Sequence, residues 1–181
     1  MGRDRRGAPL LLTLDSGFLD LASPIDWSQW TPGIHATLMF IVRGDEILLI
    51  EKKRGLGAGK INGPGGKIDP GETPLEAVIR ETQEELLVTP IDPVKLGELH
   101  FHMSDVPHII CHVYRADAFT GTPTETDEAV PVWTRFEDIP YDRMWEDDRH
   151  WLPFLLENRT FEGKFSFEGD RMLWRNIVEG D

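Results

Sequence analysis

Three glutamates with helical spacing are the residues of this chain whose types and positions could do chemistry. Glu81, Glu84 and Glu85 fall at positions i, i+3 and i+4, and on a helix they would share about 100° of one face. Clustered carboxylates suit Mg²⁺, a hard cation that prefers oxygen ligands and shares them with substrate phosphates. The alternative is a solvated acidic face, in which Arg80 relieves repulsion by pairing with Glu84 four residues later.

The helix that would carry these carboxylates has a well-defined start. Thr73 can act as the N-cap, Pro74 fits the first helical position, and Glu76 completes a capping box. We therefore expect a helix over residues 74–87. Its buried stripe should comprise Leu75, Val78, Ile79, Thr82 and Leu86.

A glycine-rich loop, residues 55–71, precedes this helix. Glycines let the main chain approach a ligand closely, although a plain tight turn would use them too. Residues 52–67 contain five basic side chains and no acidic one, whereas the whole chain has 19 Lys+Arg against 32 Asp+Glu and a net charge of −13. A positive segment beside a carboxylate face suits a metal–polyphosphate ligand.

The remaining pattern predicts the elements that position this loop and helix. We expect strands at 34–42, 46–50, 95–103, 109–116, 131–136 and 161–167, and a short amphipathic helix at 149–157. Strands before and after one strong helix, without a regular βαβ rhythm, predict an α+β domain. We assign residues 1–33 to an N-terminal appendage and residues 34–181 to the main domain.

Composition excludes several classes of function. A net charge of −13 argues against binding extended nucleic acid or anionic membranes, since such binding neutralises phosphates with Lys and Arg. The single cysteine, Cys111, excludes an intramolecular disulfide and fits a reducing compartment. The apolar run at 8–14 is too short for a membrane helix or a convincing signal peptide. We expect a cytoplasmic monomer with no membrane partner.

The loop and helix together resemble the Nudix box, G-x5-E-x7-R-E-U-x-E-E-x-G-U, in which U is a bulky apolar residue. Gly66, Glu72 and Arg80 match it, as do the three helix glutamates. Two positions depart from the pattern: Thr82 replaces an aliphatic residue, and Leu87 replaces the glycine that follows the helix. The resemblance implies the Nudix fold, a mixed β-sheet between helices with the box as a loop–helix–loop.

The similarity extends over about residues 37–169 to the oxidised purine nucleoside triphosphatases of the Nudix superfamily. It includes segments 52–55, 57–59, 62–63, 65–67, 121–123, 127–128, 144–148 and Trp151. The resemblance implies Mg²⁺-dependent hydrolysis of 8-oxo-dGTP or 2-hydroxy-dATP to monophosphate and diphosphate, which sanitises the nucleotide pool. Activity on other nucleotides or RNA 5′ ends, or a non-catalytic nucleotide sensor, are the alternatives.

The resemblance also implies roles for individual residues. The metal, Mg²⁺ with Mn²⁺ as the alternative ion, would be held by the carbonyl of Gly65 and the carboxylates of Glu81, Glu84, Glu85 and Glu128. Glu84 or Glu85 would act as the general base, while Glu72 and Arg80 would position the loop against the helix. The substrate would be bound by Thr37, Lys52, Asn62, Pro64, Gly65, Gly66, Lys67, Trp145, Glu146, Asp147 and Asp148.

Within that set, Trp145 would stack on the base while Asp147 and Asp148 meet its edge. When two carboxyl groups share a dry pocket, the pKa of at least one of them is raised. The protonated carboxyl can then donate a hydrogen bond while the ionised carboxylate accepts one. The alternative is that Trp145 belongs to the core and the aspartates cap the following helix. Leu56, Ala129 and Glu146 depart from the residues of the resembling enzymes, which leaves the base selectivity open.

Overall fold

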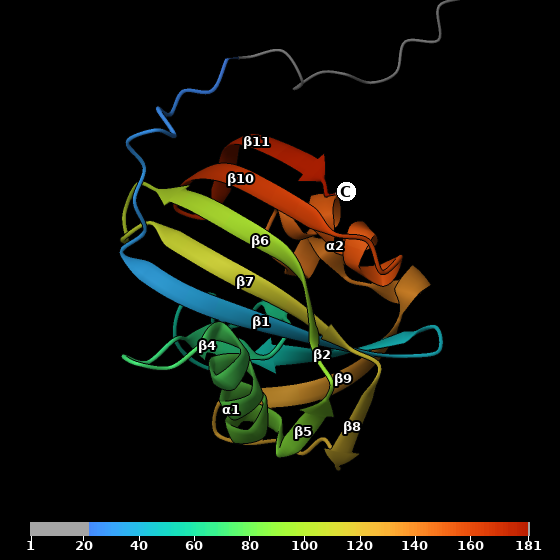
Figure 1. Cartoon of the computed structure of the whole chain (residues 1–181). Helices are drawn as coiled ribbons and strands as arrows, with labels where there is room; N and C mark the ends of the chain where they lie inside the picture. The colour runs from blue at the N-terminus through green and yellow to red at the C-terminus, as the bar shows by residue number, and fades with distance from the viewer. Residues whose placement is uncertain (1–21, 181) are drawn as a thin grey trace, which may run out of the picture.

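A computed structural model describes residues 22–180, so the apolar run at 8–14 lies outside the described residues. Within that range the strands form a nine-stranded mixed sheet and a separate two-stranded sheet (Figure 1). The strands are β1 Ile34–Arg43, β2 Glu46–Lys52, β3 Ile61–Asn62, β4 Gly65–Lys67, β5 Val88–Ile91, β6 Val94–Met103, β7 Ile109–Ala116, β8 Ala118–Gly121, β9 Ala129–Arg135, β10 Phe161–Glu168 and β11 Arg171–Glu179. The helices are α1 Pro74–Leu86 and α2 Asp148–Leu156, with 3₁₀ turns at Phe136–Asp138 and Tyr141–Arg143.

The large sheet has the order β11-β10-β6-β7-β1-β2-β3, with β4 added to β1 and β9 added to β2. Its β1–β7 and β6–β10 pairs are parallel, whereas the other pairs are antiparallel. The antiparallel β1–β2 pair is the expected hairpin, closed by Gly44 at φ +61°. The parallel pairs join segments that are distant in sequence.

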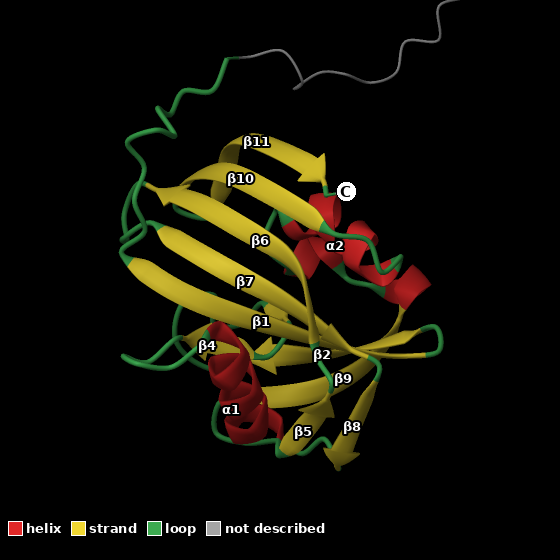
Figure 2. Ribbon diagram, in the orientation of Figure 1, coloured by secondary structure: helices red, strands yellow, loops and turns green. Residues whose placement is uncertain are grey.

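The two α-helices cover opposite faces of this sheet (Figure 2). Met39 of β1 packs with Val78 and Leu86 of α1, whereas its neighbour Phe40 packs with Trp151 of α2. Successive side chains of a strand point to opposite faces, so β1 contributes to both layers. The predicted α+β fold, with a mixed sheet between helices, is confirmed.

Helix α1 begins as predicted and buries a slightly different face. Thr73 and Glu76 form the reciprocal capping box. Thr82 is fully buried and its hydroxyl donates to the carbonyl of Val78 at 2.7 Å, which accommodates a polar residue at an apolar position. The expected burial of Leu75 was wrong: it is 41% exposed, and Ala77 is buried instead. Leu75 lies in the first turn of α1, at the end of the buried stripe.

Five strands were missed in the sequence, and their lengths and pairings explain why. β3, β4, β5 and β8 have two to four residues each, so no alternating pattern can develop in them. β11 forms the edge of the sheet and pairs with β10 alone. Its solvated positions obscure the alternation that identified β10.

The described part of the N-terminal appendage packs on the α1 side of the sheet. The Trp30 ring stacks on His100 of β6, with a centroid distance of 5.0 Å, and the Trp27 ring lies 5.9 Å from Trp174 of β11. His100 alternates with Leu99 and Phe101, which point toward α2. Residues 27–30 therefore act as a strap across the sheet. No helix in the described residues is long and apolar enough to cross a membrane.

Candidate metal and nucleotide site

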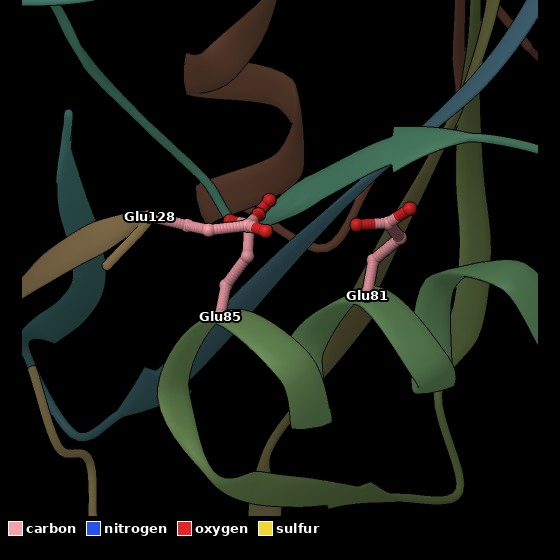
Figure 3. Close-up of side chains that lie close together, drawn as sticks. All are labelled: Glu81, Glu85 and Glu128. Carbon is pink, nitrogen blue, oxygen red and sulfur yellow. The ribbon is translucent and has the colours of Figure 1, made fainter. Parts of the chain in front are cut away.

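Three carboxylates from two segments meet beside the glycine-rich loop. Glu81 and Glu85 project from α1 and Glu128 precedes β9, and each contributes an oxygen to a group whose members lie within 4.8 Å of one another (Figure 3). Glu85 is 4% exposed, and its Oε2 is buried without a hydrogen-bond partner. Such a set of hard oxygen donors suits a divalent cation.

The electrostatics of Glu85 fit the same interpretation. Burial raises the pKa of Glu85 to about 8, and the negative charges of Glu81 and Glu128 add to this effect, while Lys52 opposes it. The pKa of Glu81 is raised as well, mainly by burial. A cation in the cluster would stabilise the charged forms that burial disfavours.

The structure does not bring Glu84 into this cluster. Its side chain is 54% exposed, and its Oε2 accepts a hydrogen bond from Nη1 of Arg80 at 3.3 Å. Gly65, the other predicted ligand outside the carboxylate group, lines the same cavity as Glu85. The roles of both residues stay predictions.

Arg80 and Glu72 join the loop to the helix. Arg80 Nε and Nη2 donate to the two oxygens of Glu72 at 2.7 and 2.9 Å, and Nη2 also donates to the carbonyl of Lys67 at 3.2 Å. The hydrogen bonds from Arg80, together with one from the backbone N–H of Asp69, lower the pKa of Glu72 to about 2. Nη1 of Arg80 contacts Glu81 Oε1 at 2.9 Å, so one guanidinium positions both the loop and a cluster carboxylate.

Gly66 is required where this loop passes the helix. A Cβ at position 66 would lie 2.6 Å from Cδ of Glu81, well inside van der Waals contact. A side chain here would push either the loop or Glu81 away. The close approach explains in physical terms why the motif begins with glycine.

An open cavity adjoins the cluster, with about 840 Å³ of empty space including its mouth. Its predicted lining residues are Thr37, Lys52, Asn62, Gly65, Gly66, Trp145, Asp147 and Asp148, and Glu85 joins them. Its lining also includes apolar side chains that no motif of the sequence predicts: Leu38, Phe101, Met103, Ile109 and Phe167. Strand alternation could have identified these side chains as inward-facing, but not as facing a cavity.

Asp147 and Asp148 are buried in this cavity wall, each 2% exposed. Asp147 Oδ2 accepts from Trp151 Nε1 at 2.8 Å, while its Oδ1 has no partner. Asp148 Oδ2 accepts from the backbone N–H of Trp145 at 3.1 Å. Asp147 occupies the N-cap position of α2 but makes no side-chain capping bond, so capping does not account for it.

Burial raises the pKa of both aspartates, and the charge of Asp147 raises that of Asp148 further. Two carboxyl groups this deeply buried favour a state in which one carries a proton. The pair then offers one donor and one acceptor to a ligand.

Trp145 lies between the glycine-rich loop and β10. Gly57, at φ +80°, brings the loop so close that a Cβ there would lie 2.9 Å from the indole Nε1. Lys60 Nζ lies 5.0 Å from the ring centroid, and Phe167 meets the ring edge-on at 5.9 Å. Because Trp145 also lines the cavity, it is placed to contact a ligand rather than only the core.

Three predicted substrate residues are not among those lining the cavity. The carbonyl of Pro64 accepts from the N–H of Met39 at 2.8 Å. Lys67 is exposed and contributes its carbonyl to Arg80. The carboxylate of Glu146 accepts from the N–H of Met172 at 3.2 Å, which ties it to the β10–β11 hairpin.

Comparisons with known proteins agree with this geometry. A NUDIX domain matches residues 33–155. The chain is 41% identical over 138 residues to the oxidized purine nucleoside triphosphate hydrolase of Danio rerio, covering 76% of this chain and 88% of that protein. It is 38% identical over 147 residues to the Mus musculus hydrolase of the same name, covering 80% of this chain and 94% of that protein.

A solved structure is also similar to this chain in fold. The MutT protein of Bacillus halodurans matches with a TM-score of 0.73 and 25% identity, over 80% of this chain and 97% of that one. The predicted resemblance is confirmed both in sequence and in fold. The family match, the relatives and the carboxylate cluster of the structure lead to one conclusion. The chain belongs to the Nudix hydrolase family.

Proposed function

We propose that this protein hydrolyses oxidised purine nucleoside triphosphates, such as 8-oxo-dGTP and 2-hydroxy-dATP, to the monophosphate and diphosphate. One observation carries the proposal: a single cavity is lined both by Glu85 of the carboxylate cluster and by the buried pair Asp147 and Asp148. A nucleotide needs a metal–phosphate site and a base site in one cavity. The names of the relatives in Danio rerio and Mus musculus support the same substrate class.

The buried aspartates would distinguish the oxidised base. Oxidation of a purine changes which ring atoms donate and which accept hydrogen bonds, and a protonated–ionised pair presents one group of each kind. A site built to pair with such a pattern rejects a base that leaves its buried polar atoms unpaired. Trp145 would stack on the ring, and Asn62, whose Oδ1 accepts from the N–H of Gly63 at 2.8 Å, would donate its amide N–H to the purine.

We infer that Mg²⁺ is the cofactor, with Mn²⁺ as the alternative ion. Glu81, Glu85 and Glu128 would hold it, with Glu84 and the carbonyl of Gly65 as further ligands. When bound, the ion would supply Lewis-acid stabilisation of the charge that develops on the phosphates. The chain itself would position these ligands through Arg80 and Glu72, and Glu84 or Glu85 would accept a proton from the attacking water.

We propose further that the protein acts as a cytoplasmic monomer, with residues 34–181 as the hydrolase domain and residues 1–33 as its appendage. Glu85, Asp147 and Asp148 line one cavity from within a single chain, which supports a monomeric enzyme. The buried free thiol of Cys111 fits a reducing compartment. Light scattering of the purified protein should give a mass near 20.6 kDa, and a dimer mass would contradict this part of the proposal.

A substrate panel tests the proposal. We would compare kcat/KM for 8-oxo-dGTP, 2-hydroxy-dATP, dGTP, dATP and capped or triphosphorylated RNA in the presence of Mg²⁺. The oxidised purines should exceed their unmodified counterparts by at least about tenfold. Equal rates on dGTP and 8-oxo-dGTP would contradict the selectivity but leave the hydrolase. A nucleotide-induced rise in Tm without diphosphate release would instead indicate a sensor.

A further inference from the structure

An arginine outside the Nudix box holds one member of the carboxylate cluster. Arg54 Nη2 contacts Glu128 Oε1 at 2.5 Å, joining the loop after β2 to the segment before β9. The Arg54 side chain is 64% exposed, and that of Glu128 is 36% exposed. Glu128 is also the cluster member that does not come from α1. The contact therefore lies at the solvent side of the candidate metal site.

The two arginines of the site are held differently. Arg80 is anchored by Glu72 and the carbonyl of Lys67 as well as by its contact with Glu81. For Arg54, the structure records Glu128 as the ion-pair partner within the described residues. The guanidinium of Arg80 is thus a fixed part of the scaffold. That of Arg54 can leave its carboxylate without breaking another ion pair.

The loop that carries Arg54 stays in place through the residue before it. The backbone N–H of Lys53 donates to the carbonyl of Glu128 at 2.9 Å. Lys53 Nζ contacts Glu125 at 2.5 Å and the carbonyl of Thr126 at 2.8 Å. Loss of the Arg54–Glu128 pair would therefore free a carboxylate oxygen without releasing the loop.

We propose that Arg54 is an exchangeable counter-ion for Glu128, and that it sets the divalent-metal concentration at which the site fills. In the metal-free protein Arg54 neutralises part of the repulsion among Glu81, Glu85 and Glu128. A divalent cation that takes the Glu128 carboxylate must displace this guanidinium, so the ion pair opposes metal binding. Arg54 is a positioning residue in this scheme, and the scheme rests on the metal site of the proposed function.

The test measures metal binding in the absence of nucleotide. Isothermal titration of Mn²⁺ into the full chain at low ionic strength would compare wild type, Arg54→Gln and Lys53→Gln. Both substitutions remove one positive charge from the same loop, but only Arg54 contacts a cluster carboxylate. Arg54→Gln should lower the Kd for Mn²⁺ about two- to fivefold, the range expected for a half-exposed ion pair.

The matched control is Lys53→Gln, which keeps the backbone hydrogen bond from residue 53 to the carbonyl of Glu128. It should leave the Kd within about 1.5-fold of wild type, because the side-chain partner Glu125 lies outside the cluster. In a Glu128→Gln background, Arg54→Gln should no longer change the Kd. Added salt should reduce the difference in the Kd for Mn²⁺ between wild type and Arg54→Gln, because it screens the ion pair. The Mg²⁺ concentration for half-maximal hydrolysis should fall in Arg54→Gln.

Equal shifts in Arg54→Gln and Lys53→Gln would indicate a general charge effect and overturn the inference. An unchanged or weaker Kd in Arg54→Gln would overturn it as well, while Mn²⁺ binding by the wild type would leave the proposed function standing. If the wild type bound no Mn²⁺, or bound it no better than Glu85→Gln, the metal site of the proposed function would fail together with the inference.

Discussion

The guanidinium of Arg80 forms a two-point ion pair with the carboxylate of Glu72, with Nε–Oε1 and Nη2–Oε2 distances of 2.7 and 2.9 Å. Parallel hydrogen bonds of this kind fix orientation as well as distance. They hold the glycine-rich loop, which lines the cavity, against the helix that carries Glu81 and Glu85. The pair therefore couples the phosphate side of the proposed site to its metal ligands.

Arg80→Lys should lower kcat by about 10- to 100-fold, the range seen when a residue that orients a metal ligand is lost. Lysine keeps the positive charge but cannot make the two parallel hydrogen bonds. Steady-state kinetics at saturating Mg²⁺ would measure the effect. Full activity in Arg80→Lys would show that a positive charge at position 80 is enough to position the loop and Glu81.

Glu72→Gln should reduce the loss of unfolding free energy that accompanies a fall in pH. The pKa of Glu72 is lowered from 4.5 to about 2 in the folded state. The stabilisation is therefore present above pH 4.5 and is lost as the pH falls toward 2. Urea unfolding at pH 7 and pH 3 would measure this loss. The unfolding free energy should fall less between the two pH values in Glu72→Gln than in wild type. An identical loss in both proteins would mean that other carboxylates dominate.

Glu85→Gln and Glu84→Gln should separate the buried cluster from the exposed carboxylate beside it. Glu85→Gln should lower kcat by about 10²- to 10⁴-fold, since it removes either a metal ligand or the general base. The metal-free Tm should hold or rise, because a neutral amide avoids the free-energy cost of either protonating a buried carboxylate or keeping it charged beside Glu81 and Glu128. Glu84→Gln should cost less than Glu85→Gln, and the reverse order would assign the larger role to Glu84.

Binding of an oxidised purine nucleotide should weaken as the pH rises through the titration of the aspartate pair. The donor proton is retained below the raised pKa of the pair and lost above it. Fluorescence titration with 8-oxo-dGMP between pH 5 and 9 would follow this, and Asp148→Asn should flatten the profile. Asp142→Asn, which alters an aspartate that is 96% exposed, is the control and should keep the wild-type profile.

Trp30→Ala should destabilise the protein while leaving hydrolysis intact. Trp30 stacks on His100 and His108, with ring distances of 5.0 and 6.1 Å, on the sheet face opposite the cavity. Loss of this half-buried ring should cost about 1–3 kcal/mol of unfolding free energy. Urea unfolding would measure the loss, and Trp30→Phe should recover part of it. A large fall in kcat/KM would instead connect the strap to the cavity.

Leu87→Gly should stabilise the protein by about 0.5–1 kcal/mol. Leu87 ends α1 in the left-handed conformation, at φ 59° and ψ 30°, and is 56% exposed. Glycine adopts this conformation without strain, and an exposed leucine contributes little burial. Leu87→Ala is the control, because alanine keeps the strain and should not stabilise. The measurement is the unfolding free energy in urea.

Local spacing was enough to predict the central helix, its cap and its acidic face. The Thr73–Glu76 capping box and the positions of Glu81 and Glu85 depend on residues within a few positions of one another. Such features are determined by helix geometry alone. The departure at Leu87 was visible in the sequence as well, but its left-handed backbone was not.

The long-range part of the site required the folded chain. Glu128 lies more than forty residues after Glu85, and its carboxylate meets the cluster because β9 pairs with β2 beside the glycine-rich loop. The exposure of Glu84 and the exclusion of Glu146 from the cavity wall also follow from packing. No sequence pattern distinguishes these carboxylates from those that line the site.

The sequence by itself determined which groups are available: a helix bearing metal-binding carboxylates, a glycine loop with positive charge, and two adjacent aspartates. The tertiary structure decided which of them meet. It did so through strand pairs that join segments separated by long connections, such as β9 with β2 and β1 with β7. Their register is set by burial on both faces of the sheet, and that energy depends on the whole fold rather than on neighbouring residues.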